Sequence, residues 1–359
     1  MRGLFMIAIV NSQCEYWKRE FGATVIVKKK NFQNVVKKAI DKGLKPVIQI
    51  DDDLDELNFL SELPKNSFIG WLYADESLNL SFNKKVSRLE SISIILRPYH
   101  LKPQKIRNIK SSLTYIAGNL KQIRSGVEFI KAFLWFWRGL GMYSREWKIM
   151  QMMKKQNRLF YNFPLGYTDI FCYSYLNTCG SETIDRNQSL LSRILPSRIV
   201  QTKSLSFVGQ VGQIVRMLAI RCAEIAPNSI VIRRDVYGAG NYETKDVRVN
   251  GLEYVRILLD SKFVLCPPGN ISGNTFRIHE TVIARRVPLV ISNPLSDPNF
   301  ESPVASLFPG EKITSWNKLI TEIDSVTPEK YQELVNTNFW VLNNQIKNAR
   351  EFIENFEKT

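Results

Sequence analysis

The sequence predicts an α/β protein built from parallel sheets in two Rossmann-like domains. Short runs rich in β-branched residues alternate with helical or turn-rich stretches, which is the pattern of parallel strands joined by crossover helices. The chain has 359 residues, too many for one compact core and suitable for two domains. In its second half, residues 261–293 contain a complete strand, loop, helix and strand.

Five strands are expected in the first hundred residues, at the segments MIAIV, ATVIV, PVIQI, SFIGWLY and SISIIL. The apolar run LFMIAIV has only seven residues and is followed by the polar Asn11, Ser12 and Gln13. Because this run is too short for a membrane span, we predict a buried strand here and not a signal peptide or an anchor.

Residues 104–160 are helical and aromatic in character and are predicted to form an insertion in the first domain. Their aromatic side chains, which lie beside many cations, include Phe129, Phe133, Trp135, Phe136, Trp137 and Trp147. We favour a buried helical hairpin broken at Gly139-Leu140-Gly141, with a helix lying in a membrane interface as the alternative. The segment PLGY at 164–167 then restores extended structure.

A polar stretch at 179–198 is the expected linker between the domains, and the second α/β unit begins near Ser204. The final segment, 328–357, has the pattern of a long amphipathic helix. These features divide the chain into a first domain at 1–190, a second domain at 191–327 and a C-terminal helix at 328–359.

The composition, with 44% hydrophobic and 23% charged residues, is that of an ordinary globular protein. Five scattered cysteines and only two histidines argue against a zinc site and for reduced, mostly buried thiols. The net charge of +15 favours anionic partners, yet the basic residues form no stripe interleaved with stacking aromatics. We therefore expect no nucleic acid. Because the sequence shows no apolar run of 18 residues, we expect a cytoplasmic protein, with peripheral contact to the inner face of an anionic membrane as a further alternative.

The segment 261–293 carries the strongest indication of function. A strand at 262–266 leads through a glycine-containing loop to a helix that bears Arg277 and Glu280, and Pro288 opens the next strand. A helix N-terminus at the carboxyl edge of a parallel sheet attracts phosphate. An Arg can pair with a pyrophosphate, and a carboxylate on the same helix face can accept from a ribose diol. His279 lies about 200° round the helix from Arg277 and is expected to face elsewhere.

This arrangement predicts a pocket for a nucleoside diphosphate. The loop residues expected to contribute backbone N–H groups or side chains are Gly269, Asn270, Ser272, Gly273 and Asn274.

The same region resembles the C-terminal half of exostosin-type glycosyltransferases. The matching residues are Ser261-Lys262-Phe263, Pro268 with Gly269, Arg277, Glu280, and Pro288 with Val290. A second match upstream comprises Phe207, Gly209 and Arg216 in SFVGQVGQIVRMLAI. Fainter similarities occur at YADES (Asp75, Glu76), LRPYH (Arg97, Tyr99) and PLGY. The good coverage is about residues 200–300, less than a third of the chain.

The resemblance implies a GT-B fold, in which two Rossmann-like domains face each other across a cleft and a C-terminal helix packs back on the N-terminal domain. It implies an inverting transfer of a sugar from a nucleotide sugar, most commonly UDP-linked, to a glycan or lipid-linked acceptor in polysaccharide biosynthesis. Gly209, Arg216 and Arg277 would then lie at the donor, with Arg216, Arg277 and loop N–H groups stabilising the leaving diphosphate in place of a metal. No other cofactor is expected.

The general base is expected from the first domain, on the side of the sugar opposite the diphosphate. Asp75 and Glu76 follow the strand SFIGWLY, and His100 ends the segment SISIILRPYH, so all three lie near the carboxyl end of a strand. We favour Glu76, because a partly buried carboxylate beside an Asp has its pKa raised. His100 has the better ordinary pKa for neutral pH.

Two other functions remain open. Asp51, Asp52 and Asp53 follow a strand and could hold a divalent metal, as in a GT-A glycosyltransferase, although the same run suits the acidic start of a helix. The second alternative is a non-catalytic basic protein that binds nucleic acid or anionic lipid.

Overall fold

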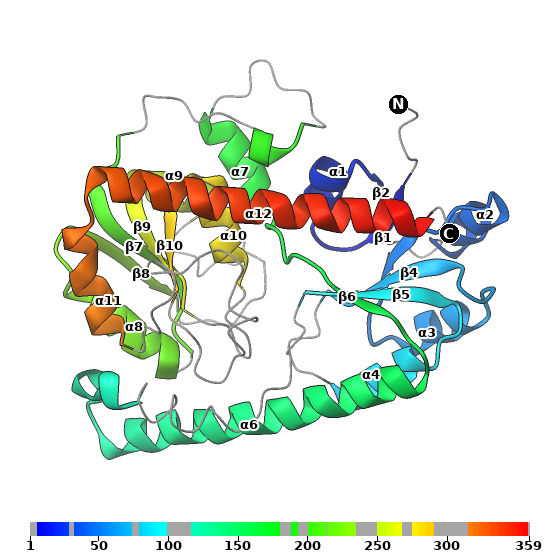
Figure 1. Ribbon diagram of the computed structural model, residues 1–359, viewed down its shortest axis with the longest axis horizontal. Coiled ribbons are helices and arrows are strands. Elements are labelled where there is room, and N and C mark those ends of the chain that lie inside the picture. The colour runs from blue at the N-terminus through cyan, green and yellow to red at the C-terminus, as the bar shows by residue number, and fades with distance from the viewer. Residues whose placement is uncertain are drawn as a thin grey trace.

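The computed structural model describes residues 6–28, 32–73, 79–98, 116–179, 188–192, 200–212, 214–234, 250–267, 275–290 and 315–357. Within these residues the protein is α/β, with two entirely parallel sheets. The sheets lie in separate parts of the molecule, which we call the first half and the second half after the sheet that each contains (Figure 1). The prediction of an α/β fold with parallel sheets is confirmed.

The first sheet has the strand order β2-β1-β3-β4-β5-β6. Its strands are β1 (Ile7–Val10), β2 (Thr24–Val27), β3 (Val47–Gln49), β4 (Phe68–Trp71), β5 (Ile92–Arg97) and β6 (Phe160–Asn162). The helices between them are α1 (Cys14–Phe21), α2 (Phe32–Asp41), α3 (Leu54–Ser61) and α4 (Leu80–Ser87). All five strands expected in the first hundred residues are present, and β1 and β4 are buried as their apolar sequences require.

The second sheet has the order β10-β9-β7-β8. Its strands are β7 (Lys203–Gln210), β8 (Ser229–Arg234), β9 (Ser261–Leu265) and β10 (Val287–Leu289). The accompanying helices are α8 (Ile214–Glu224), α9 (Gly251–Asp260), α10 (Phe276–Ile283) and α11 (Trp316–Glu322), while α7 (Asp169–Cys179) comes between the two sheets in sequence. The expected strand, loop, helix and strand unit is therefore confirmed as β9, α10 and β10.

Helix α12 (Pro328–Glu357) is the expected final helix, and it runs from the second sheet to the first across the upper part of the view in Figure 1. On the second half it meets Arg285, whose guanidinium lies 3.1 Å from the centroid of the Phe339 ring. On the first half, Phe352 stacks on Tyr161 with ring centroids 4.1 Å apart, and Arg350 Nε donates to the Glu20 carbonyl at 2.8 Å. Helix α12 therefore contacts residues that accompany both sheets.

The predicted hairpin in the aromatic insertion is wrong. Residues Gly126–Lys155 form one continuous helix, α6, which passes through Gly139-Leu140-Gly141 without a break. Each glycine costs a helix only about 1 kcal/mol, and tertiary anchoring outweighs that cost. Ala132 packs in the core of the second sheet, whereas Ile149 and Met153 pack in that of the first. The helix therefore spans both halves along the edge opposite α12 (Figure 1).

The hydrophobic core is continuous between the sheets. One cluster joins Trp17 and Trp71 of the first half to Val264 and Ile278 of the second, with Ile346 of α12 packed among them. All five cysteines are free, and Cys172, Cys222 and Cys266 are buried. Most of the predicted linker at 179–198 lies outside the described residues, and the predicted domain boundaries stay predictions.

Across the described part of the chain, no helix combines the length and the apolar character needed to cross a membrane.

A buried ion pair anchors α6 to the first sheet. Arg97 ends β5 and Glu146 lies on α6, with their side chains 1% and 0% exposed. Nη1 donates to Oε1 at 3.1 Å and Nη2 to Oε2 at 3.2 Å, which is a two-pronged pair. Such geometry offsets the large cost of removing two charges from water.

We predict that Glu146→Ala lowers the free energy of unfolding by about 3–5 kcal/mol, because it leaves a buried guanidinium without its carboxylate. Urea denaturation measures this loss. The double variant Arg97→Met/Glu146→Leu, which removes both charges, should recover most of the stability. A single variant as stable as the wild type would show that the pair contributes nothing.

Candidate functional site

The carboxyl ends of β7 and β9 lie at the switch point of the strand order, which is where open parallel sheets bind ligands in a crevice. Strand β8 pairs with β7 on one side and β9 pairs with it on the other, so the chain order reverses between β7 and β9. Helix α8 begins after β7, and α10 begins after β9. Both helices direct their N-terminal ends, with the positive end of the helix dipole, toward this crevice.

Arg277 lies in the first turn of α10 and packs against the end of β7. Its guanidinium carbon is 4.8 Å from the centroid of the Phe207 ring, and Nη2 donates to the Val208 carbonyl at 2.6 Å. Nε is buried and, within the described residues, has no hydrogen-bond partner. The Phe207 ring thus holds a half-buried guanidinium at the carboxyl end of β7, with a buried Nε that no described residue accepts from.

Gly209 makes room for this guanidinium. A Cβ atom on Gly209 would overlap Arg277 Nη2, so any larger residue would displace the arginine. The structure therefore brings together two of the predicted donor residues, Gly209 and Arg277. Arg216, a third, is half-buried in the first turn of α8, directly beyond the end of β7.

The start of α10 faces the carboxyl edge of the first sheet. The ring of Phe276, the first helical residue, lies 6.0 Å from that of Tyr73, which follows β4. Thr275 precedes the helix in an extended conformation but makes no capping bond, and its Oγ1 is buried without a partner among the described residues. The two sheets thus approach each other through their carboxyl edges at α10.

Glu280 has contacts that sequence analysis missed. The residue is 1% exposed; Oε1 accepts from the Thr168 amide at 3.2 Å and hydroxyl at 2.8 Å, and Oε2 accepts from the Tyr254 hydroxyl at 2.8 Å. Burial raises the pKa of Glu280, while these hydrogen bonds act in the opposite direction. The carboxylate joins α10 to α9 and to the segment leaving β6, and its expected contact with a ribose stays a prediction.

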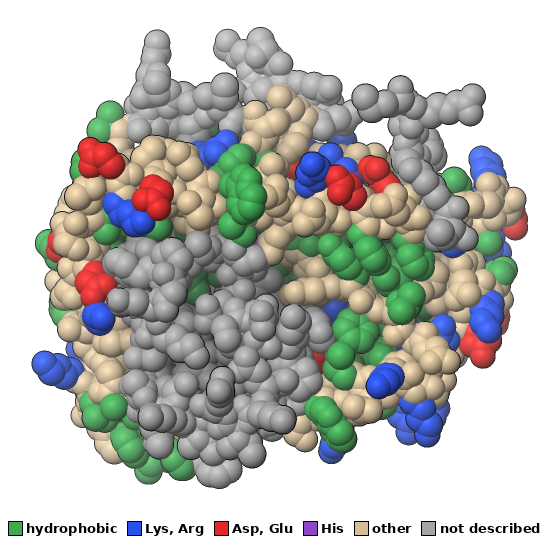
Figure 2. All heavy atoms as spheres, in the orientation of Figure 1, with side chains coloured by type: hydrophobic (Ala, Val, Ile, Leu, Met, Phe, Trp, Pro, Cys, Tyr) green, Lys and Arg blue, Asp and Glu red, His purple; other side chains and the backbone are tan. Residues whose placement is uncertain are grey.

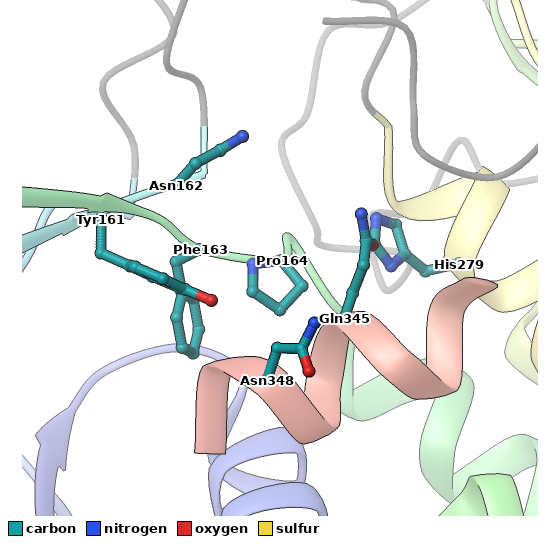
Figure 3. A pocket seen from close by; sticks show the side chains of 7 residues that line it. All are labelled: Tyr161, Asn162, Phe163, Pro164, His279, Gln345 and Asn348. Carbon is teal, nitrogen blue, oxygen red and sulfur yellow. The ribbon is translucent and has the colours of Figure 1, made fainter. Parts of the chain in front are cut away.

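His279 faces away from Arg277, as its helical position predicts, and lines a cavity between the two halves (Figure 3). The cavity has a volume of about 140 Å³. Its lining consists of Tyr161, Asn162, Phe163, Pro164, His279, Gln345 and Asn348. In Figure 3 the side chains of His279 and Gln345 lie together, from α10 and α12 respectively. Among the described residues this lining is largely polar and includes no acidic residue and no Lys or Arg.

The three aspartates after β3 are engaged in separate contacts. Asp53 Oδ1 caps α3 by accepting from the amides of Asp55 and Glu56 at 2.9 and 3.1 Å, which is the acidic helix start. Asp51 Oδ2 lies 3.3 Å from Lys28 Nζ, and Asp52 Oδ1 lies 3.0 Å from Lys85 Nζ. Among the described residues no group of three His, Cys, Asp or Glu side chains is arranged to hold a metal ion.

The other predicted site residues lie outside the described residues. They are Asp75, Glu76 and His100 of the predicted acceptor side and Gly269, Asn270, Ser272, Gly273 and Asn274 of the predicted donor loop. Sequence analysis also missed the roles of Thr168, Tyr254 and Gln345, because each meets α10 from a distant element and no local pattern marks such a contact.

The chain matches no protein-family model and no curated protein. The geometry described above therefore carries the functional argument.

His279 gives the site a testable pH dependence. Burial lowers its pKa to about 3, whereas an unfolded histidine titrates near 6.5. As pH falls below 6.5 the unfolded chain binds a proton that the folded protein does not, so the folded protein loses stability between about pH 6.5 and pH 3, by at most about 1.4 kcal/mol per pH unit.

We predict that His279→Gln loses less stability than the wild type when the pH is lowered from about 6.5 to about 5. Chemical denaturation at a series of pH values measures the difference. The carboxylates titrate in both proteins, so the difference between the two curves reports on His279 alone. Parallel curves would contradict the assignment of a buried, neutral imidazole.

Proposed function

We propose that the protein is a glycosyltransferase that moves a sugar from a nucleotide diphosphate sugar to a hydroxyl of a glycan or lipid-linked acceptor. The observation that carries this proposal is the position of α10. Its N-terminus and Arg277 lie at the crevice of the second sheet, and its first residue, Phe276, contacts Tyr73 at the carboxyl edge of the first. A donor held there would present its sugar to the other half of the molecule, as in a GT-B arrangement.

The electrostatics of this end of α10 suit a diphosphate. The helix dipole favours an anion, and so do the Thr275 hydroxyl and Arg277 Nε, two buried groups that have no hydrogen-bond partner among the described residues. Arg216 adds a second cation in the first turn of α8. The resemblance to exostosin-type enzymes supports the same residues and favours a UDP-linked sugar.

The acceptor side of the proposal uses the cavity beside His279. His279 is the third residue after Phe276, which corresponds to a rise of about 4.5 Å along the helix, so the cavity lies within one turn of the proposed diphosphate site. Amide, phenol and imidazole groups hydrogen-bond sugar hydroxyls, and the described lining residues carry no Asp, Glu, Lys or Arg, which suits a neutral ring. Glu76 remains our preferred general base, with Asp75 and His100 as alternatives.

We predict that Arg277→Ala weakens UDP binding roughly ten- to a hundred-fold, because one charge-assisted contact is lost. Arg277→Lys should recover only part of the affinity, since an ammonium lacks the planar fork. Isothermal titration with UDP measures both variants. The matched control is Arg256→Ala, which removes an exposed arginine from α9 in the same half. Wild-type affinity in Arg277→Ala would contradict the assignment.

We predict that sugar transfer survives chelation. If Arg216, Arg277 and the start of α10 neutralise the leaving diphosphate, EDTA should leave turnover unchanged. The measurement is release of UDP from a panel of UDP-sugars with and without EDTA. Activity abolished by EDTA and restored by Mn²⁺ would favour the GT-A alternative, with Asp51, Asp52 and Asp53 as the metal ligands.

A further inference from the structure

Helix α6 presents a sharply divided surface. Two residues near the N-terminus of α6 face the protein. Glu128 accepts a hydrogen bond from Arg221 Nη2 at 2.6 Å, and Ala132 is buried against α8. Hydrogen bonds from Arg221 lower the pKa of Glu128 to about 2, so this carboxylate is charged at neutral pH. At 100° per residue these two residues define one side of the helix.

The opposite side of this N-terminal part of α6 is apolar and exposed. The exposed fractions are Val127 61%, Phe129 44%, Ile130 57%, Phe133 41% and Leu134 56%. Steps of 100° place these five residues on an outward arc about 160° wide, centred opposite Glu128 and Ala132. Apolar side chains gather at the lower left edge of Figure 2, where α6 begins in Figure 1. A contiguous apolar patch of this kind marks an interaction surface.

On the C-terminal part of α6, the same outward face is cationic. Glu146, Ile149 and Met153 are buried, which turns Arg145, Lys148 and Lys155 outward, and all three are exposed. Trp147 lies beside them and is 52% exposed. Helix α6 contains only two acidic residues, Glu128 and Glu146, and each is held inward by an arginine.

We propose that this face of α6 docks on an anionic phospholipid bilayer. Val127, Ile130, Phe133 and their neighbours would enter the boundary between headgroups and acyl chains. The cations on the C-terminal part of α6 would contact lipid phosphates. An anionic bilayer suits both the apolar half and the basic half of this helix face, and the alternatives do not. A second copy of α6 would set cations against cations in a parallel pairing, or against apolar side chains in an antiparallel one. Nucleic acid would leave the apolar half exposed.

The proposal is independent of the proposed enzymatic activity, because it uses no residue of the α10 site.

The first experiment is co-sedimentation of the full chain with sucrose-loaded vesicles. Vesicles of equimolar phosphatidylcholine and phosphatidylglycerol should bind the protein at low ionic strength, and pure phosphatidylcholine vesicles should bind it roughly tenfold or more weakly. Equal binding to both compositions, or binding to neither, would overturn the proposal.

Two variants assign the surface. Ile130→Asp/Phe133→Asp places charges in the apolar half, and Arg145→Glu/Lys148→Glu reverses the basic half; each should weaken binding to the anionic vesicles roughly tenfold or more. The matched controls are Leu54→Asp, at a site 64% exposed, and Lys65→Glu, also exposed, neither of which belongs to α6. They should bind as the wild type does.

Circular dichroism melting checks that each variant is folded. We expect folded variants, because all four changed side chains are exposed. Analytical ultracentrifugation without lipid gives the other decisive outcome. If the wild type dimerises and Ile130→Asp/Phe133→Asp is monomeric, a second copy covers the patch and the membrane proposal is wrong. Variants that bind vesicles as tightly as the wild type would also overturn it.

Discussion

The carboxylate of Glu280 makes the contacts on which the arrangement of the central helix depends. Placing a carboxylate in the interior is costly, and here three hydrogen bonds from Thr168 and Tyr254 offset the cost. Those bonds join α10 to α9 and to the segment that leaves the first sheet. They fix the rotation of α10, and with it the direction of every other side chain on this short helix.

The other sides of α10 each meet a different element. Arg277 packs on Phe207 at the end of β7, Phe276 meets Tyr73 beyond β4, and His279 faces the cavity next to α12. Because neighbouring residues on a helix point about 100° apart, eight residues are enough to connect both sheets and a long helix. The proposed donor site and the proposed acceptor cavity are therefore two sides of one rigid element.

Helices α6 and α12 support this arrangement from outside. Each has thirty residues, and each packs on both halves; in Figure 1, α6 runs along the lower edge and α12 crosses the upper part of the view. Helix α6 belongs in sequence to the first half and reaches the second through the Arg221 ion pair, whereas α12 follows the second half and reaches the first through Phe352. Relative movement of the halves would have to disturb packing at both helices.

The sequence by itself determined the elements whose signals are local. Short β-branched runs identified β1 to β5, the spacing after Ser261 identified β9, α10 and β10, and the acidic run that includes Asp53 suited the start of α3. The proline at 328 and the amphipathic pattern after it fixed both ends of α12. These signals depend on residues within about one turn or one strand of each other, so they can be recognised in the sequence without knowledge of the fold.

Only the tertiary structure decided features that depend on distant partners. Gly139 and Gly141 suggested a break, yet anchors on both sheets keep α6 continuous. Residue spacing placed Arg277 and Glu280 on one face, but Thr168, more than a hundred residues away, turned the carboxylate inward. The close approach of Gly209 to Arg277 likewise needs β7 and α10 to be adjacent. Free energies of burial and ion pairing across such separations exceed the local preferences that a sequence pattern records.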